Sequence, residues 1–183
     1  MAEVLRVQNR EDWRRWLSLH HLSVGEIWLA VQKVKSTKAG VKYLEAVEEV
    51  IAIGWIDGKM RHLDGEEFML RFTPRRSDSF WSLKNRIIAE RLMAEGKMAD
   101  KGIARVEEAK KNGRWDSAYS SLIAPAIPSE LEEVLKNRGV WDNFNRVSNS
   151  AKLQWVFWVN EAKRPETRNR RIAELIKKMS EVV

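Results

Sequence analysis

A group of aromatic, charged and amide side chains in the first half of the chain could bind an anion or a planar group. Trp55, Asp57 and Lys59 alternate along one segment, and Arg71 and Arg75 belong to a second. Residues two apart in a β-strand share a face, so each segment would present its side chains together. Arg and Lys donate charge-assisted hydrogen bonds to anions, and an indole beside them accepts cationic or planar groups. The predicted ligand site comprises Trp55, Asp57, Lys59, Arg71, Arg75, Trp81 and Asn85.

The two segments are predicted to form a β-hairpin around Asp64 and Gly65, because alternating runs flank these turn residues. With a two-residue loop, Asp57 would lie opposite Phe72 and place a charge among apolar side chains. A three-residue loop with Gly65 in the left-handed conformation instead places Asp57 opposite Arg71. This register predicts one apolar face and one face of complementary charge pairs.

The same charges also have a purely structural interpretation. In that case another element covers the polar face, and Asp57 pairs with Arg71 inside the protein. The sequence leaves both interpretations open.

The rest of the N-terminal half is predicted to surround this hairpin with an α+β unit. A capped helix begins after Asn9, residues 26–34 form a strand, and residues 42–53 form a helix whose C-cap is Gly54. That helix should turn Val47, Val50 and Ile51 inward and Glu45, Glu48 and Glu49 toward solvent. The order predicts a small three-stranded sheet with a crossover helix, right-handed if the joined strands are parallel neighbours.

The C-terminal half is predicted to be helical. Apolar spacing favours helices that end at Gly96, Gly113 and Gly139, the last one starting with a capping box at Ser129. Residues 115–128 are predicted to form a loop. We expect an α+β unit at residues 1–80 and a helical region at residues 81–183 packed on it, the two forming one integrated domain.

Two further helices are predicted near the C-terminus. The apolar run of residues 155–159 is assigned to a buried helix, and Pro165 to the first position of a terminal helix. The short turn between them could imitate a helix-turn-helix. An alternative function is therefore nucleic-acid binding through Arg164, Arg168, Arg170 and Arg171. Against it, Glu174 lies four residues from both Arg170 and Lys178, the spacing of an ordinary solvated face.

Composition limits the possible chemistry. The 183 residues include 33 Lys and Arg against 26 Asp and Glu, a net charge of +7, and no Cys. Thiolate metal sites and cysteine nucleophiles are thereby excluded. The histidines, His20, His21 and His62, make no convincing metal pair, because adjacent helical residues do not share a face. We expect no metal and no cofactor and identify no catalytic residue, although an enzymatic activity stays open.

Five motifs occur in order along the chain. They are Gly54-Trp55-Ile56-Asp57-Gly58, Arg71-Phe72-Thr73-Pro74-Arg75, Trp81-Ser82 with Asn85, Gly113-Arg114-Trp115-Asp116, and Ala162-Lys163-Arg164-Pro165-Glu166-Thr167-Arg168 with Arg170-Arg171-Ile172. Together they resemble the YdeI/OmpD-associated family, often labelled bacteriocin-protection proteins, over nearly the whole chain. The resemblance implies a bacterial or archaeal protein linked to tolerance of bacteriocins or cationic antimicrobial peptides. It supplies no catalytic residues.

The expected cellular location and the net charge both limit the functional hypothesis. The N-terminus lacks the features of a signal peptide and no apolar run is long enough to span a bilayer, so we expect a soluble, cytoplasmic protein. A net charge of +7 opposes direct capture of cationic peptides. Protection would then be indirect, through an anionic small molecule or a protein partner bound at the predicted ligand site.

Overall fold

The structure is a computed structural model that describes residues 4–118 and 125–181. Contacts between Cα atoms divide the chain into two compact units, Met1–Ser117 and Ala118–Val183. Residues 83–111, which the sequence analysis grouped with the C-terminal helices, belong to the first unit. The described residues form eight helices and a five-stranded sheet, so the prediction of a mixed helical and sheet protein is confirmed.

The first unit contains all the strands. They are β1 (Val4–Leu5), β2 (Ile27–Gln32), β3 (Val41–Lys42), β4 (Trp55–His62) and β5 (Glu67–Pro74). Its helices are α1 (Arg10–His20), α2 (Tyr43–Ala52), α3 (Leu83–Ala94) and α4 (Asp100–Lys111). Asn9 caps α1 as predicted, because its side chain accepts a hydrogen bond from the backbone N–H of Asp12 at 2.9 Å.

The sheet has the strand order β1-β2-β5-β4, with β3 also paired to β2. The prediction of three strands is wrong, because the two-residue strands β1 and β3 both add parallel pairs to β2. β5 lies between β2 and β4 and is antiparallel to both. The strands joined by α2 are therefore parallel but not neighbours. β4 takes the edge, where its exposed Lys59 and Arg61 are well suited to solvent.

The hairpin register also differs from the prediction. Asp57 lies opposite Phe72, and the pairing shifts by one residue before Met60, which lies opposite Leu70. Asp57 therefore does not face Arg71. The shift is a β-bulge around Gly58 and Lys59. The predicted three-residue loop is also wrong, because four residues, 63–66, separate β4 from β5.

Asp64, and not a left-handed Gly65, holds the hairpin turn. Positive φ angles among the described glycines occur at five positions, and Gly65 is not one of them. The Oδ1 atom of Asp64 accepts hydrogen bonds from the backbone N–H groups of Glu66 and Glu67, both at 2.8 Å. These bonds and the ammonium of Lys38 hold the pKa of Asp64 well below its usual range.

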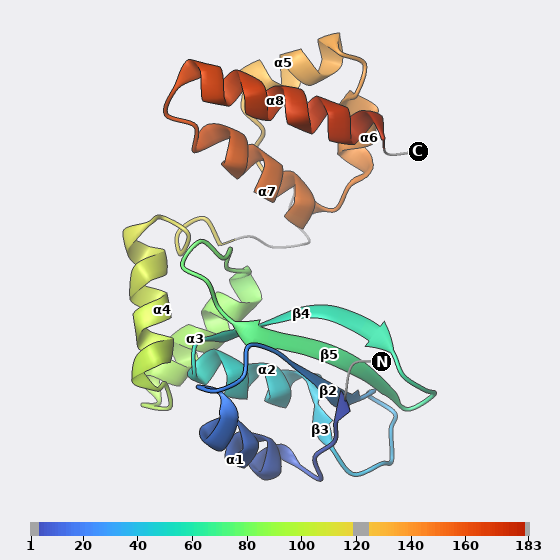
Figure 1. Ribbon diagram of the computed structural model, residues 1–183, viewed down its shortest axis with the longest axis vertical. Helices are drawn as coiled ribbons and strands as arrows, with labels where there is room; N and C mark the ends of the chain where they lie inside the picture. The colour runs from blue at the N-terminus through green and yellow to red at the C-terminus, as the bar shows by residue number, and fades with distance from the viewer. Residues whose placement is uncertain (1–3, 119–124, 182–183) are drawn as a thin grey trace. The chain divides into compact units, whose positions relative to one another are not determined.

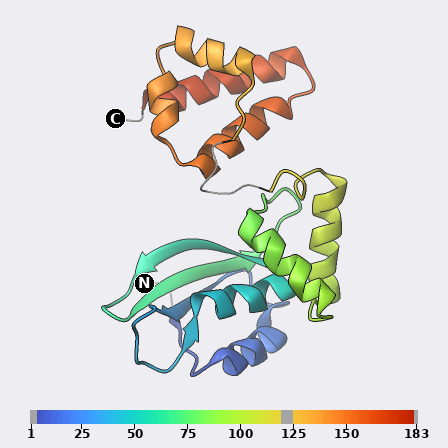
Figure 2. The same ribbon diagram turned by 180° about the vertical axis from the view of Figure 1, so that it is seen from behind.

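α1 and α2 cover one face of the sheet (Figures 1 and 2). Trp13 of α1 is fully buried; its ring centroid lies 5.7 Å from that of Phe72, and its indole N–H donates to the carbonyl of Ala46 at 3.2 Å. Glu49 was expected to face solvent and is instead 6% exposed. It can be buried because two arginines of α1 donate hydrogen bonds to its carboxylate.

The N-terminal turn of α4 approaches the end of α2 closely. The backbone N–H of Ala99 donates to the carbonyl of Ala52 at 2.9 Å. A Cβ atom added to Gly102 would lie 2.3 Å from that same carbonyl oxygen. The C-cap of α2 is Ile53, one residue before the predicted Gly54, and Gly54 ends the helix with a φ of +81°. Glycine at positions 54 and 102 allows the backbones of α2 and α4 to approach each other closely.

The second unit is a bundle of four helices, α5 (Ser129–Asn137), α6 (Trp141–Arg146), α7 (Asn149–Asn160) and α8 (Pro165–Ser180). Its core buries Leu131, Leu135, Val140, Phe144, Val156, Val159, Leu175 and Met179. The apolar run of residues 155–159 is helical and Pro165 opens α8, both as predicted. The capping box at Ser129 is wrong, because Pro128 is the N-cap and Ser129 already lies inside the helix. Residues 119–124 of the predicted loop lie outside the described residues.

Gly102→Ala should destabilise the first unit. Alanine in a helix is ordinarily more stable than glycine by about 0.8–1 kcal/mol. Here the new methyl group would clash with the Ala52 carbonyl, so we expect a net loss of about 1–3 kcal/mol. Urea unfolding followed by circular dichroism measures it. Gly65→Ala is the control, since nothing lies within 4 Å of its Cβ position; equal midpoints for the two variants would contradict the close approach.

Glu49→Gln should cost about 1–3 kcal/mol of stability at neutral pH. Burial raises the pKa of Glu49, but hydrogen bonds from Arg14 and Arg10 outweigh burial and lower the pKa overall. A carboxyl whose folded pKa is lowered stabilises the protein above its unfolded pKa, about 4.3, and loses that contribution as pH falls through the folded value. The difference in the free energy of unfolding between wild type and Glu49→Gln should therefore decrease as the pH falls. Urea midpoints across this range check it, and a gap independent of pH would point to lost packing instead.

Candidate functional site

Two donors from different helices fix the carboxylate of Asp57. The Tyr43 hydroxyl, at the start of α2, donates to Oδ2 at 3.0 Å, and Nδ2 of Asn85 donates to Oδ1 at 3.1 Å. Asn85 lies in the first turn of α3, where its backbone N–H donates to the capping side chain of Ser82 at 3.1 Å. Asp57 and Asn85 are thus brought together as predicted, on the helix-covered face of the sheet.

Arg75 and Trp81 form a second pair in a stack of cations and indoles. Arg75 is 3% exposed, and its Cζ lies 3.8 Å from the ring centroid of Trp81. Trp81 meets Trp115 edge to face with centroids 4.9 Å apart. Arg86 lies on Trp115, with its Cζ 5.4 Å from the ring centroid. Its Nη1 donates to the backbone carbonyl of Trp115 at 3.1 Å. A desolvated cation–π contact contributes about 2 kcal/mol, so this stack is a strong stabilising feature.

The other predicted residues lie apart from these two pairs. Arg71 is opposite Trp28 of β2, on the face of the sheet away from Asp57, and its Nε donates to Glu26 at 3.0 Å. Lys59 is exposed at the bulge, whereas Trp55 is 3% exposed. The structure therefore does not assemble the seven residues on one polar face. Their binding of a ligand stays a prediction.

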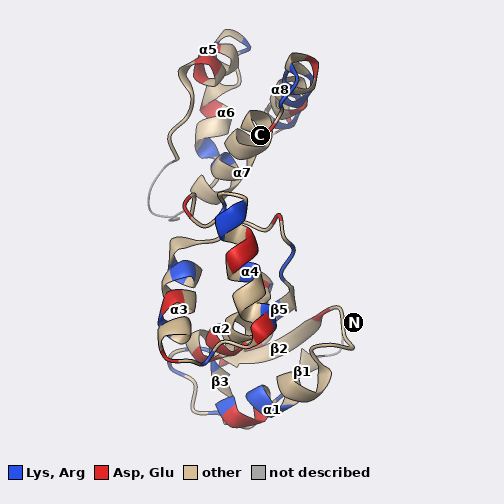
Figure 3. Cartoon of the chain, turned by 90° about the vertical axis from the view of Figure 1, so that its left-hand side faces the viewer, with Lys and Arg blue, Asp and Glu red and all other residues tan. Residues whose placement is uncertain are grey.

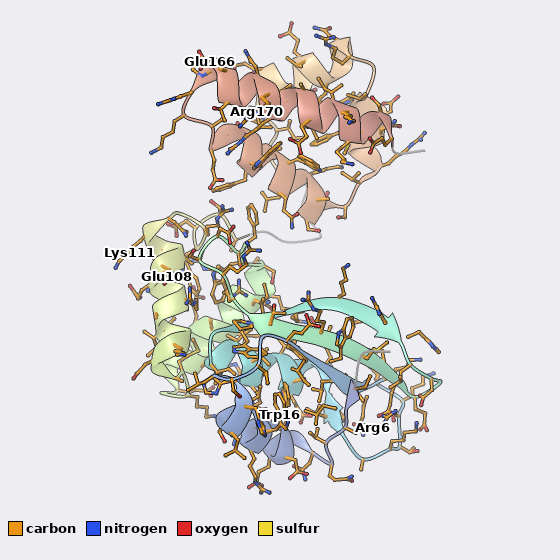
Figure 4. The ribbon with its side chains drawn as sticks, viewed as in Figure 1. Arg6, Trp16, Glu108, Lys111, Glu166 and Arg170 are labelled. Atoms are coloured by element: carbon orange, nitrogen blue, oxygen red, sulfur yellow. The ribbon has the colours of Figure 1, made fainter. Side chains whose placement is uncertain are left out.

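The four arginines of the alternative site lie on or beside α8. Nη2 of Arg168 donates to Glu130 at 3.2 Å. Arg171 donates to the carbonyl of Trp158, and its Cζ lies 5.1 Å from that ring centroid. Arg164, the N-cap residue, is exposed. Arg170 is exposed as well (Figure 4). Two of the four therefore hold neighbouring helices in place.

Sequence reasoning missed three residues of these networks. Glu49 was assigned to solvent by helical periodicity, and Tyr43 and Trp115 were given no polar or stacking role. The spacing of Arg10 and Arg14, one helical turn apart, was a usable signal for a buried acid between them. Tyr43 and Trp115 carried no such signal, because their contacts depend on tertiary packing.

Residues 4–118 and 125–181 contain neither a cluster of metal ligands nor a helix that could span a membrane. In these ranges no three His, Cys, Asp or Glu side chains are grouped so that they could hold a metal ion. No helix of the same ranges has the length and apolar character needed to cross a membrane.

Arg75→Ala should destabilise the protein far more than Arg71→Ala. The first removes a buried cation from Trp81 and its hydrogen bond to Phe80, about 2 kcal/mol or more. The second breaks a partly exposed ion pair with Glu26, about 0–1 kcal/mol. Urea midpoints of the two variants compare the effects. Similar losses would contradict the contrast between a buried Arg75 and a partly exposed Arg71.

Comparison with known families assigns the two parts of the chain separately. A family model described as a domain of unknown function (DUF8412) matches residues 5–105, more than half of the chain. A second model, described as bacteriocin-protection, YdeI or OmpD-associated, matches residues 124–181. The expected resemblance is confirmed there, although this match is confined to the C-terminal part. No curated protein and no solved structure matches the chain. The chain therefore belongs to the family of the DUF8412 domain of unknown function, and its residues 124–181 are similar to the YdeI/OmpD-associated bacteriocin-protection family.

Proposed function

We propose that this chain is a binding protein that recognises an acidic segment of a partner protein through an arginine stripe on α8. The stripe consists of Arg164, Arg168 and Arg171, at helical spacings of four and three residues. Arg168 and Arg171 share one face of α8, and Arg164, the N-cap, lies one turn before Arg168, whose backbone N–H donates to the Arg164 carbonyl at 3.0 Å. This grouping is the observation that carries the proposal.

The stripe is supported by the protein around it. Glu130 of α5 accepts from Arg168, and the Trp158 carbonyl of α7 accepts from Arg171. Side chains held in this way lose less entropy when a carboxylate binds. Arg164 is exposed at the end of the stripe, where its guanidinium can bind a carboxylate through two parallel hydrogen bonds.

The surrounding charges favour an acidic peptide over nucleic acid. Residues 118–183 contain 11 Lys and Arg against 8 Asp and Glu, a net charge of only +3. Glu130 is 83% exposed beside Arg168, and Glu166 lies on α8 itself (Figures 3 and 4). These carboxylates would repel a continuous row of phosphates, whereas a short peptide can place its acids between them.

The matched family links this unit to bacteriocin protection, and we place the present protein in that context. With a net charge of +7 it is poorly suited to capture a cationic peptide directly. Tolerance would instead follow from its contact with an acidic partner in the cytoplasm. The proposal requires no catalytic step and no cofactor.

Binding of fluorescein-labelled polyglutamate at physiological salt tests the stripe. Arg164→Ala should weaken binding about five- to tenfold, the loss of one charge-assisted contact. Arg170→Ala is the matched control, because it removes the same charge from the same helix at a position that points about 120° away from the stripe. Equal losses in both variants would show that only net charge matters.

Two further measurements separate the alternatives. Duplex DNA that binds more tightly than polyglutamate, with strong salt dependence, would move the assignment to nucleic acid. In cells that lack the gene, wild type and Arg170→Ala should restore bacteriocin tolerance and Arg164→Ala should not. Full restoration by Arg164→Ala would refute a role of the stripe in tolerance.

A further inference from the structure

A pocket of about 270 Å³ opens between α1, α2 and the residues that follow α3. Three cations line it, Arg10, Arg14 and Lys97, together with the carboxylates of Glu48 and Glu49. We propose that this pocket binds a small oxyanion, the carboxylate or phosphate group of a metabolite, through Arg10, Arg14 and Lys97. The site lies in the first unit and is separate from the stripe on α8.

A buried acid holds the two arginines in position. Nε of Arg10 donates to Oε1 of Glu49 at 2.6 Å, while Nε and Nη2 of Arg14 donate to Oε2 and Oε1 at 2.9 and 2.7 Å. The side chain of Glu49 is 7% exposed, against 34% for Arg10 and 61% for Arg14. The carboxylate therefore lies beneath both guanidinium groups, which are fixed before a ligand arrives.

Each arginine keeps a donor for a ligand. Nε and Nη2 of Arg10 are engaged by Glu49 and Glu48, and Nε and Nη2 of Arg14 by Glu49. Within residues 4–118 and 125–181, none of the hydrogen bonds from either guanidinium uses Nη1. The hydrogen bonds to Glu49 raise the pKa of Arg14, so its positive charge is secure at any physiological pH.

The end of α3 places Lys97 at the pocket. Gly96 adopts a φ of +64°, and the N–H groups of Lys97 and Gly96 donate to the carbonyls of Leu92 and Met93 at 2.8 and 3.0 Å. This pair of bonds is a Schellman motif, which sets the direction of the chain as it leaves the helix. Lys97 pairs with Glu95 at 2.7 Å and is 63% exposed, so its ammonium can move to a stronger anion.

The charges in the pocket favour an anion. Three cations face two carboxylates there, and both carboxylates are already engaged, Glu49 as above and Glu48 by Arg10 at 2.9 Å and by Arg91. A cationic ligand would have to displace these arginines, whereas an anion can add to them. Ala52 and Leu92 supply an apolar wall for a short carbon skeleton. The volume is near the lower limit of ligand pockets, about 300 Å³, so the ligand must be small.

Isothermal titration calorimetry with inorganic phosphate and with succinate tests the site at physiological salt. Calorimetry is preferred to thermal shift, because both anions also stabilise proteins without binding a site. We expect saturable binding of at least one probe by the whole protein. Arg14→Ala and Lys97→Ala should each weaken it by about tenfold or more.

Arg15→Ala is the matched control, since Arg15 follows Arg14 in α1, is 66% exposed and does not line the pocket. It should bind as wild type does. If Arg14→Ala fails to fold, Lys97→Ala decides the outcome, because it removes an exposed side chain. The absence of saturable binding of both probes, or unchanged affinity in Lys97→Ala, would overturn the proposal.

Discussion

Burial of Phe72 against Trp13 decides where the polar side chains of the first unit can point. Because side chains alternate along a strand, Arg71 must face away from the helices once Phe72 faces them. The pairing that follows on β4 would place Lys59 opposite Leu70 on the buried side. The bulge puts Met60 opposite Leu70 instead, and Lys59 and Met60 are both exposed on this edge strand. One local irregularity thus keeps the charge of Lys59 away from the apolar face.

This arrangement leaves carboxylates near the core, where they accept hydrogen bonds that connect neighbouring helices. Asp57 joins the first residue of α2 to the first turn of α3, and Glu49 joins α2 to two arginines of α1. A buried carboxylate without donors would be very costly, so each network also specifies which helix packs at that place. Polar contacts here set the arrangement of helices whose stability comes mainly from apolar burial.

Features that depend on residues within one helical turn could be predicted from the sequence. Features that depend on tertiary packing could not. Asn9, Gly54 and Pro165 each act within one turn of helix; Asn9 and Pro165 were assigned correctly, and Gly54 lies one residue beyond the C-cap of α2. The register was not assigned correctly, because Gly58 has no side chain to show where alternation breaks. The seven residues of the predicted ligand site do not lie on one face for the same reason. The prediction assumed that side chains alternate along the whole strand without a break. The burial of Glu49 depended on α1, which periodicity within α2 cannot reveal.

The two matched families fall on different compact units, and this bears on how binding can be organised. The segments of residues 5–105 and 124–181 each lie within one unit, and each unit has its own buried core. The pocket cations depend on Glu49, and the stripe depends on Glu130 and Trp158, so the two sites share no supporting residue. Changes at sites without shared partners are expected to add. An effect of an oxyanion in the pocket on peptide binding at α8 would therefore be direct evidence that the two units are energetically coupled.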